Sequence, residues 1–560
     1  MEPMILKRYQ EWLNSDKLSK DEKEELFLIK DNEQEIINRF NQDLEFGTGG
    51  LRGIMAVGTN RMNRHIIRKA SQGLANYLNN NFKNPKVAIA YDSRLQSDFF
   101  AKVASETLAA NNVEVYLYSE LMPTPALSFA VRYLHCDAGI VVTASHNPKK
   151  YNGYKVYGPD GCQITVDAAK AILGEIQKVD VFNDVKFAKF DECVKDGKIH
   201  LLDDEVFEAF IASTLKQSLY KGNRDIKLVY TPLYGAGYRS VTTALKRDGF
   251  NHLEIVKEQI GPDGNFPTTP YPNPEIKEAL ELGIKLLLES KSHILLATDP
   301  DSDRCGVVVN QNGNPVILTG NEVGILLFDF IYQRRKALNQ LSEHPVLVKT
   351  IVSSDMANVM AKSFGVDVIE VLTGFKFIGE QMLHLEQKGQ IDRFLFGFEE
   401  SCGYLSNPDV RDKDAVNAVV LIAEMADYYL SQGLSLKDRM DALYQQYGDF
   451  KTALLTFEFE ESVYKAKIAS LMSLFRSEKV YDVIPNVDHV GDYLKQKIIY
   501  KDHEESSGLP ASDVMKFFLK DNETITVRSS GTEPKLKAYI FANGEKQLEN
   551  FKKLINKLIK

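Results

Sequence analysis

Short apolar runs typical of buried strands alternate with helical patterns along most of the chain. The first series has strand-like runs at residues 87–91, 113–117 and 138–143, with helical spacing of apolar residues between them. Strands that alternate with helices of this length are typical of βαβ units and a mainly parallel sheet. The same rhythm returns over residues 226–297 and again over 322–396. The pattern therefore predicts three units of similar architecture.

Both ends of the chain differ from this rhythm. A capping box formed by Ser19 and Glu22 predicts a helix ahead of the first unit. After residue 450, strand-like runs and two helical patterns indicate more antiparallel pairing. The predicted fold is of the α/β class, with three βαβ-type domains and a C-terminal α+β domain. The expected domains are residues 1–210, 211–315, 316–448 and 449–560.

Composition and charge argue against nucleic acid and membranes as binding partners of this chain. The 560 residues carry 68 basic and 77 acidic side chains, a net charge of −9, and no basic stripe marks a nucleic-acid surface. An anionic ligand must therefore be bound by local cations. The five cysteines are widely spaced, which predicts reduced thiols in the cytoplasm rather than disulfides or zinc. The N-terminus lacks the apolar core of a signal peptide, and Glu424 and Asp427 interrupt the most apolar helix, so no membrane partner is expected.

The first chemistry-bearing segment is Thr-Ala-Ser-His-Asn-Pro at residues 143–148. It follows a predicted buried strand, so Ser145 is expected at the edge where open α/β sheets bind ligands. A serine-hydrolase elbow is disfavoured because Thr143 and Asn147, not glycines, flank this serine. The alternative is an ordinary turn without a catalytic role, since Ser, His, Asn and Pro are common turn residues.

The second segment is Asp-Pro-Asp-Ser-Asp-Arg at residues 299–304. Three carboxylates at alternate positions point the same way if the backbone is extended. Such a group of negative charges is unfavourable without a cation, and oxygen ligands suit Mg²⁺ or Ca²⁺. Arg304 and Asn310 stand where an EF-hand needs Gly and Glu, which excludes that motif. An acidic surface turn is the alternative.

Two further segments suit an anion and a polyol. Residues 528–534, Arg-Ser-Ser-Gly-Thr-Glu-Pro, combine a guanidinium, hydroxyls and a glycine, as in an anion cradle. The Glu-Glu-Ser segment at 399–401 offers acceptors for sugar hydroxyls. The alternative for the first segment is a solvated hairpin turn, and the alternative for the second is an acidic loop.

The glycine-rich stretch at residues 47–53 is neither a Walker A loop nor a dinucleotide fingerprint. The remaining interpretation is a tight turn that presents Arg52.

Four loops of these kinds, in this order, resemble those of the α-D-phosphohexomutase superfamily along essentially the whole chain. The glycine-rich stretch and the length resemble its phosphoglucomutase and phosphopentomutase branch. The resemblance implies four domains around a central cleft, a phosphoryl group carried by Ser145, and one Mg²⁺ per chain. The implied ligands of the metal are an oxygen of phosphorylated Ser145 and the carboxylates of Asp299, Asp301 and Asp303.

The resemblance also implies the remaining site residues. A lysine with a depressed pKa or a histidine would suit the general base. Lys537 stands where many members carry Arg, and the two differ in how they bind a phosphate. The other implied catalytic residues are His146, Lys155, Arg52 and Lys413. The implied substrate-binding residues are Arg304, Thr373, Gly374, Lys376, Glu399, Ser401, Arg528, Ser529, Ser530, Gly531 and Thr532.

The activity implied is the interconversion of glucose 1-phosphate and glucose 6-phosphate, with glucose 1,6-bisphosphate as intermediate and activator. Phosphomannomutase and phosphopentomutase activities are alternatives with the same mechanism. A phosphatase, a kinase-like phosphotransferase and a non-catalytic sugar-phosphate-binding relative stay open as well. The expected partner is a small sugar phosphate, with no nucleic acid or membrane, and the chain is expected to be a cytoplasmic monomer or homodimer.

Overall fold

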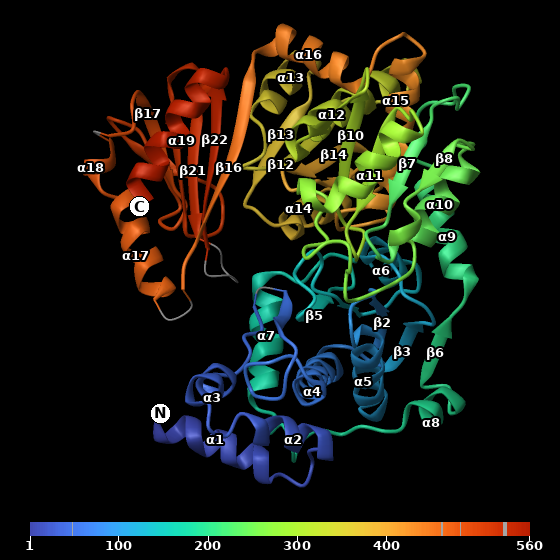
Figure 1. Ribbon diagram of the computed structural model, residues 1–560, viewed down its shortest axis with the longest axis vertical. Coiled ribbons are helices and arrows are strands. Elements are labelled where there is room, and N and C mark those ends of the chain that lie inside the picture. Colours follow the sequence, from blue (N-terminus) through green and yellow to red (C-terminus); the bar gives the residue numbers. More distant parts are fainter. Residues whose placement is uncertain (48, 461–462, 482, 530–534, 560) are drawn as a thin grey trace.

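The polypeptide folds into four β-sheets that follow one another along the chain (Figure 1). The computed structural model describes residues 1–47, 49–460, 463–481, 483–529 and 535–559. The first three sheets mix parallel and antiparallel strands, whereas the described strands of the fourth pair only antiparallel. The predicted α/β class, with three βαβ-type units and a different C-terminal domain, is confirmed.

The first two sheets contain the strands expected from the apolar runs, together with added edge strands. The six-stranded first sheet is, in spatial order, β1 (Gly50–Ile54), β5 (Tyr151–Tyr157), β4 (Ala138–Val142), β2 (Lys86–Tyr91), β3 (Glu114–Tyr118) and β6 (Ile199–Leu202). The five-stranded second sheet is β11 (Asn314–Leu318), β10 (Cys305–Gln311), β9 (Ile294–Thr298), β7 (Leu228–Thr231) and β8 (Leu253–Ile255). Because β11 belongs to this sheet, the sheet runs past the boundary expected at residue 315. The domain boundaries stay a prediction.

The third and fourth sheets follow in the same way. The four-stranded third sheet is β13 (Asp367–Val371), β12 (Val346–Thr350), β14 (Phe394–Glu399) and β15 (Gly403–Leu405). The seven-stranded fourth sheet is β16 (Phe450–Glu458), β22 (Lys535–Asn543), β21 (Thr524–Ser529), β20 (Val514–Leu519), β17 (Val487–Asp492), β18 (Lys497–Ile499) and β19 (Glu504–Ser506). The sequence pattern missed β18 and β19 because each has only three residues, and β19 is polar and exposed, so neither shows a period that a pattern can detect.

The first three units share one topology. In each, the first strand (β2, β7 or β12) pairs in parallel with the second and third strands of its unit. A return strand (β5, β10 or β15) then pairs antiparallel with the third strand. The helices between the strands are α5 (Ser97–Ala110), α6 (Thr124–Tyr133), α10 (Gly237–Arg247), α11 (Lys277–Glu289), α13 (Met356–Phe364) and α14 (Phe375–Gln387). Three of the segments singled out for chemistry therefore occupy one equivalent place, between the third strand and the return strand.

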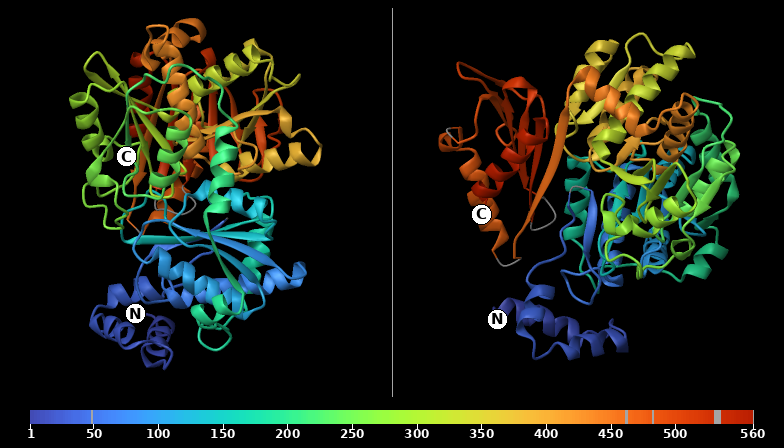
Figure 2. Two further views of the ribbon diagram at one scale, coloured as in Figure 1. Left: turned by 90° about the vertical axis from the view of Figure 1, so that its right-hand side faces the viewer. Right: turned by 45° about the horizontal axis from the view of Figure 1, so that its top comes forward.

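The hydrophobic core joins the first three units and leaves the fourth with its own. One cluster of buried side chains extends from Ala88 to Phe450 and includes strands of the first three sheets. A separate cluster, from Ile468 to Ile559, fills the C-terminal domain. Figure 2 shows this domain, in red, on one side of the molecule, with β16 as the strand nearest to the rest. The fourth domain therefore has its own core, and a small apolar cluster that joins Ile351, Val352 and Leu372 to Tyr493, Val514, Tyr539 and Phe541 packs it against the third unit.

The most apolar helix is a core element. Helix α15 (Ala415–Leu430) is buried along almost its whole length, because it packs against elements of the first three units. Glu424 tolerates this burial since its carboxylate accepts hydrogen bonds from the backbone N–H groups of Leu219 and Tyr220. Among the described residues, none of the helices combines the length and the apolar character needed to cross a membrane.

Three helices precede the first sheet: α1 (Pro3–Asn14), α2 (Lys20–Leu28) and α3 (Glu33–Phe40). The predicted capping box of Ser19 and Glu22 opens α2, as expected. The segment is fixed by Trp12, the only tryptophan, whose ring contacts the rings of Phe40, His65 and Phe182. His65 and Arg64 lie on α4 (Arg64–Asn81), and both reach the carboxylate of Glu22.

This anchor should make the stability of the N-terminal helices depend on pH. Burial alone would raise the pKa of Glu22, but hydrogen bonds from His65 and Ser19 outweigh it and lower the pKa to about 2. A depressed pKa stabilises the folded state above the unfolded value near 4.5, and this stabilisation disappears as the pH falls from 4.5 towards 2. Glu22→Gln is therefore expected to lower the free energy of unfolding by about 1–2 kcal/mol at pH 7. The difference should shrink below pH 4.5, measured by urea titration of Trp12 fluorescence. A difference that is the same at pH 7 and pH 3.5 would contradict this expectation.

Candidate active site

The loop between β4 and β5 directs Ser145 at the second unit. Ser145 is buried, with a left-handed backbone (φ 50°) that few residues other than glycine adopt. Its hydroxyl donates to Asp299 Oδ2 at 2.7 Å and lies 3.2 Å from His146 Nδ1. The structure therefore brings together the serine of the first unit and the aspartates of the second.

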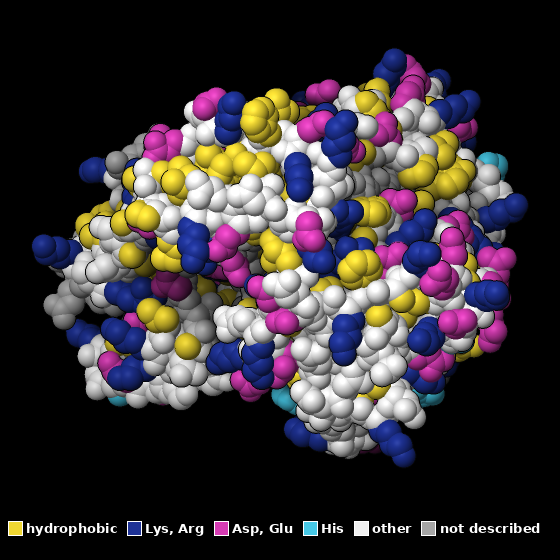
Figure 3. All heavy atoms as spheres, turned by 90° about the horizontal axis from the view of Figure 1, so that it is seen from below, with side chains coloured by type: hydrophobic (Ala, Val, Ile, Leu, Met, Phe, Trp, Pro, Cys, Tyr) yellow, Lys and Arg dark blue, Asp and Glu magenta, His cyan; other side chains and the backbone are white. Residues whose placement is uncertain are grey.

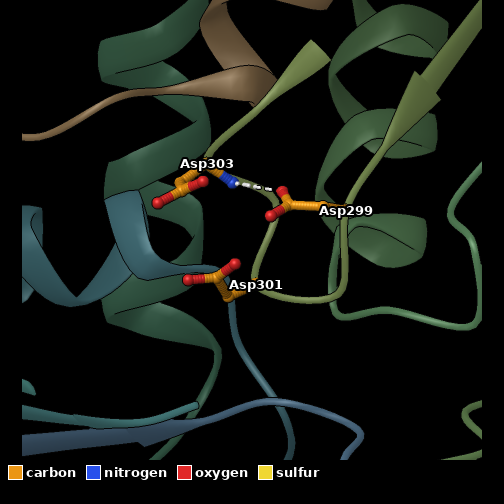
Figure 4. Close-up of side chains that lie close together, drawn as sticks. All are labelled: Asp299, Asp301 and Asp303. Atoms are coloured by element: carbon orange, nitrogen blue, oxygen red, sulfur yellow. Dashed lines mark hydrogen bonds between the residues drawn. The ribbon is translucent and has the colours of Figure 1, made fainter. Parts of the chain in front are cut away.

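The three aspartates converge through a turn between β9 and β10 (Figure 4). One carboxylate oxygen from each of Asp299, Asp301 and Asp303 lies within 4.8 Å of the others. The backbone is not extended here, so the convergence of the carboxylates does not come from the alternation of a strand. Ser302 adopts a φ of 51° and its N–H donates to the carbonyl of Asp299, so the chain folds back on itself. Asp299 Oδ1 then accepts the N–H groups of Asp303 and Arg304, both at 3.1 Å.

This cluster has the chemistry of a divalent-cation site. All three carboxylates are buried, and Asp301 Oδ1 and Asp303 Oδ1 have no hydrogen-bond partner among the described residues. Burial, with the charges of Asp301 and Asp303, raises the pKa of Asp299 well above its ordinary value. Buried carboxylate oxygens without donors and with mutual repulsion suit a hard cation such as Mg²⁺. The residues present therefore fit the metal that the sequence implies.

Two lysines lie against the same carboxylates. Lys155 Nζ, from β5, is 2.8 Å from Asp301 Oδ2 and 3.6 Å from Asp303 Oδ2, and Lys413 Nζ is 3.1 Å from Asp303 Oδ2. Burial would lower the pKa of Lys155, but Asp301 and Asp303 outweigh it and the pKa is raised. The expectation of a lysine with a depressed pKa was therefore wrong for Lys155.

His146 has the opposite electrostatic environment. Burial, followed by the positive charges of Arg304 and Arg52, lowers its pKa well below the ordinary value. The imidazole is therefore neutral at pH 7 and able to accept a proton on one ring nitrogen. Of Lys155 and His146, the imidazole is the neutral group, and its lowered pKa makes it a weak proton acceptor.

Arg52 lies on a strand and not in the tight turn that the glycines suggested. It belongs to β1, where its register partner is Gly153 of β5, and its guanidinium donates to Asn147 Oδ1 at 3.4 Å. The glycines allow a close approach of backbones: a Cβ at Gly50 would lie 2.0 Å from the carbonyl of Tyr154. Arg52 thereby reaches the serine loop from the neighbouring edge strand.

The third unit supplies polar groups to the opposite wall. Glu399, at the end of β14, accepts the N–H of Gly374 at 2.7 Å, where α14 begins. Burial raises the pKa of Glu399, and burial with the Glu399 charge raises the pKa of Glu400 to about 7. Thr373 Oγ1 is buried without a hydrogen-bond partner among the described residues. These groups provide unused acceptors and a hydroxyl for a polar ligand.

The fourth sheet contributes two cations. Arg528 of β21 and Lys537 of β22 are directly opposed across the strand pair. Like charges in this position are unfavourable unless an anion lies between or above them. Burial, followed by Arg304, lowers the pKa of Lys537. Ser529 donates to Asp513 Oδ2 at 2.9 Å. Ser530, Gly531 and Thr532 lie outside the described residues.

A cleft of about 640 Å³ connects these groups. Figure 3, a view from below, shows the hollow with Lys, Arg, Asp and Glu side chains around it. Of the predicted site residues that the structure describes, Asp299, Asp301 and Lys376 are not part of its lining, and the first two are fully buried. The predicted residues that line the cleft are Arg52, Ser145, His146, Lys155, Asp303, Arg304, Thr373, Gly374, Glu399, Ser401, Lys413, Arg528 and Ser529.

Sequence reasoning left some lining residues unassigned. Lys537, Tyr539 and Phe541 alternate along β22 and face the cleft together. Their period of two was a usable signal, since every second residue of a strand lies on one face. Glu275, which forms an ion pair with Arg304, had no such signal because it precedes α11, far from the aspartate loop in sequence.

Comparison with known proteins agrees with this arrangement. Models of the phosphoglucomutase/phosphomannomutase family match in order: α/β/α domain I over residues 43–181, domain II over 207–313 and domain III over 319–447. The phosphoglucomutase of Staphylococcus saprophyticus is 36% identical over 524 residues, which cover 91% of this chain and 94% of that protein. The Staphylococcus aureus phosphoglucomutase is 36% identical over 507 residues, 90% of each chain.

The fold is similar to a solved structure as well. The parafusin (phosphoglucomutase) of Paramecium, in its open form, superposes with a TM-score of 0.69 at 18% identity, covering 92% of this chain and 94% of that one. The family matches and the relatives extend over most of the chain, and residues of the first three loops line one cleft with Arg528 and Ser529. The expected resemblance is thus confirmed, and the chain belongs to the phosphoglucomutase/phosphomannomutase family.

Proposed function

We propose that this chain is a phosphoglucomutase that interconverts glucose 1-phosphate and glucose 6-phosphate through a phosphoserine at position 145. The observation that carries the proposal is the 2.7 Å contact between the Ser145 hydroxyl and Asp299, within a carboxylate cluster suited to a cation. The staphylococcal relatives carry the same activity in their names, which supports glucose phosphate as the substrate.

The reaction moves one phosphoryl group out and another back. The phosphoryl group on Ser145 passes to the free 6-hydroxyl of glucose 1-phosphate, so the bond from phosphorus to the serine oxygen breaks and a bond to the sugar oxygen forms. The sugar then carries two phosphates and turns within the cleft. Its 1-phosphate returns to the serine oxygen, which leaves glucose 6-phosphate. Because both transfers are in line, their rates depend on alignment and charge neutralisation.

The chain's own groups divide the remaining tasks. Asp299, Asp301 and Asp303, with a phosphoserine oxygen, would hold Mg²⁺, which neutralises charge on the transferring phosphoryl group. His146 lies beside the serine oxygen, neutral, and can take the proton of the attacking hydroxyl and return it later.

Sugar and phosphate recognition fall to the other side of the cleft. Glu399 and Ser401 can accept hydrogen bonds from sugar hydroxyls, and the opposed cations Arg528 and Lys537 can bind the phosphate that is not being transferred. The cleft thus has one place for the phosphate that is transferred and another for the phosphate that is not. A bisphosphate intermediate needs both places in order to turn and bind again.

The experiment is an assay of glucose 1-phosphate with Mg²⁺ and a trace of glucose 1,6-bisphosphate, in which glucose 6-phosphate is coupled to a dehydrogenase. Mannose, ribose and deoxyribose 1-phosphates run in parallel to test the phosphomannomutase and phosphopentomutase alternatives. Release of inorganic phosphate without isomerisation would indicate a phosphatase. No turnover of any sugar phosphate would reject the proposal.

The proposal also covers the cellular compartment and the oligomeric state of the protein. The five cysteines are all free and buried, which suits a reducing cytoplasm. We keep the expectation of a monomer or homodimer, which light scattering on the purified protein measures directly.

Lys537 provides a test of the phosphate end. Lys537→Gln is expected to raise KM for the sugar phosphate by about 10–100-fold, since a charged hydrogen bond contributes about 1.5–3 kcal/mol. Because Arg528 lies directly opposite, removing one of two like charges should not lower the melting temperature of the free protein. Lys535, whose side chain pairs with Glu458, provides the control: Lys535→Gln should leave KM unchanged. An unchanged KM in Lys537→Gln would place the phosphate elsewhere.

A further inference from the structure

The loop that carries Ser145 rests on a buried arginine that does not line the cleft. Arg94 follows β2, and its guanidinium is fully buried. It donates to the backbone carbonyls of Ser145 and Asn147, to that of Pro148 at 3.1 Å and to that of Tyr151 at 3.2 Å. Ser145, Asn147 and Pro148 belong to the connection between β4 and β5, and Tyr151 is the first residue of β5. One side chain therefore binds three carbonyl groups of the nucleophile loop and the start of the strand that follows it.

A carboxylate completes the support from the other side. Asp92 accepts the N–H of Arg94 at 2.9 Å, lies 3.4 Å from its guanidinium Nε, and accepts the hydroxyl of Thr143 at 2.6 Å. The Thr143 oxygen in turn accepts the N–H of Ser145 at 2.8 Å. The peptide groups before and after Ser145 are thus both fixed, one through Thr143 and one through Arg94.

The backbone conformation of Ser145 is unfavourable and needs the support of surrounding contacts. Ser145 has a φ of 50°, a region that is unfavourable for residues with a Cβ and that persists where surrounding contacts determine it. The second unit closes over the support: the Phe266 ring lies 5.1 Å from Arg94 Cζ, and a Cβ on Gly264 would lie 2.3 Å from the N of Leu95. Arg94 is therefore sealed from the cleft that the substrate would occupy.

We infer that Arg94, with Asp92, is a positioning residue that holds the Ser145 hydroxyl in line for phosphoryl transfer. The inference rests on the proposed function, since it assigns a role in the same reaction. Arg94 acts on the reaction through the loop backbone and has no contact with the reacting atoms. Its loss should therefore lower kcat and leave KM nearly unchanged.

The test compares Arg94→Lys with a matched variant of another buried arginine. A lysine keeps the charge but cannot span four carbonyls, so kcat should fall about 100-fold, the effect of displacing a reacting group by roughly 1 Å. Arg224 is also buried, pairs with Asp248 and Glu424, and lies outside the cleft, so Arg224→Lys should keep kcat. Both variants are assayed well below their melting temperatures.

Hydrogen exchange supplies a readout that a general loss of stability would not move. In Arg94→Lys the amides of residues 143–152 should exchange faster than in wild type, whereas in Arg224→Lys they should not. If Arg94→Lys fails to fold, Thr143→Val takes its place, because it removes the anchor of the Ser145 N–H and the link from Thr143 to Asp92 but keeps the four bonds of Arg94. The same two changes are then expected, with a smaller fall in kcat.

The outcomes separate the two proposals. An unchanged kcat in the variant, equal losses in both arginine variants, or unchanged exchange at 143–152 would each overturn the positioning role. Lack of mutase turnover by the wild-type protein would instead overturn the proposed function, and the exchange measurement would still show whether Arg94 orders the loop.

Discussion

Replacement of Ser145 by alanine is expected to lower kcat by about 10⁴-fold or more, because a covalent intermediate cannot form without its nucleophile. The fold should be unaffected, since the hydroxyl contacts only Asp299 and His146 among the described residues. The measurements are mutase activity, the melting temperature and the mass of the peptide containing residue 145 after incubation with glucose 1,6-bisphosphate. The wild-type peptide should gain one phosphoryl group and the variant peptide none.

A buried serine of the same domain provides the control. Ser105 lies in α5, and its hydroxyl bonds to the carbonyl of Ala101 in its own helix. Ser105→Ala should keep both activity and phosphorylation. Near-normal turnover by Ser145→Ala, or a phosphoryl group found on another residue, would contradict the assignment of Ser145 as the nucleophile.

Replacement of Asp299 by asparagine is expected to remove metal binding without weakening the fold. The amide has the same shape, and its oxygen can still accept the N–H groups of Asp303 and Arg304. Loss of outer-shell partners weakens metal sites by 10–100-fold, so loss of a ligand should weaken Mg²⁺ binding by more than about 100-fold. Activity should fall by more than about 10³-fold, since Mg²⁺ stabilises the developing charge of the transferring phosphoryl group.

Thermal unfolding provides a readout that is independent of activity. Mg²⁺ should raise the melting temperature of wild type, because a ligand that binds only the folded state stabilises it. Asp299→Asn should show no such rise, and without metal its melting temperature should not be below wild type, since one of three clustered negative charges is gone. Asp43, half-exposed on the surface, supplies the control Asp43→Asn with unchanged Mg²⁺ response. Stoichiometric, tight Mg²⁺ binding by Asp299→Asn would place the cation at another site.

Much of the fold was predictable because burial imposes a period on the sequence. The strands β2, β3, β4, β7, β9 and β12 lie in apolar runs, and the helices between them show regular apolar spacing. The chemistry-bearing loops were predictable for a related reason: polar residues of unusual types follow directly after buried strands, where a sheet presents them at its edge.

What the sequence did not predict depends on contacts between distant segments. The raised pKa of Lys155 arises from Asp301 and Asp303, which the fold brings beside it from the second unit. Arg94 was missed because its four acceptors are backbone carbonyls, which no side-chain motif reveals. Glu22 was found because its capping box is local, within four residues of chain.

The equivalent placement of three functional loops has an evolutionary consequence. In each of the first three units the loop joins the third strand to its antiparallel neighbour, and the strands beneath it are held by the common core. A mutation in one loop can thus alter the chemistry of the cleft without repacking the strands of the scaffold. Selection could retune sugar preference through the Glu399 loop while the phosphoserine chemistry is inherited unchanged, which would let one ancestral scaffold give rise to enzymes for many different sugars.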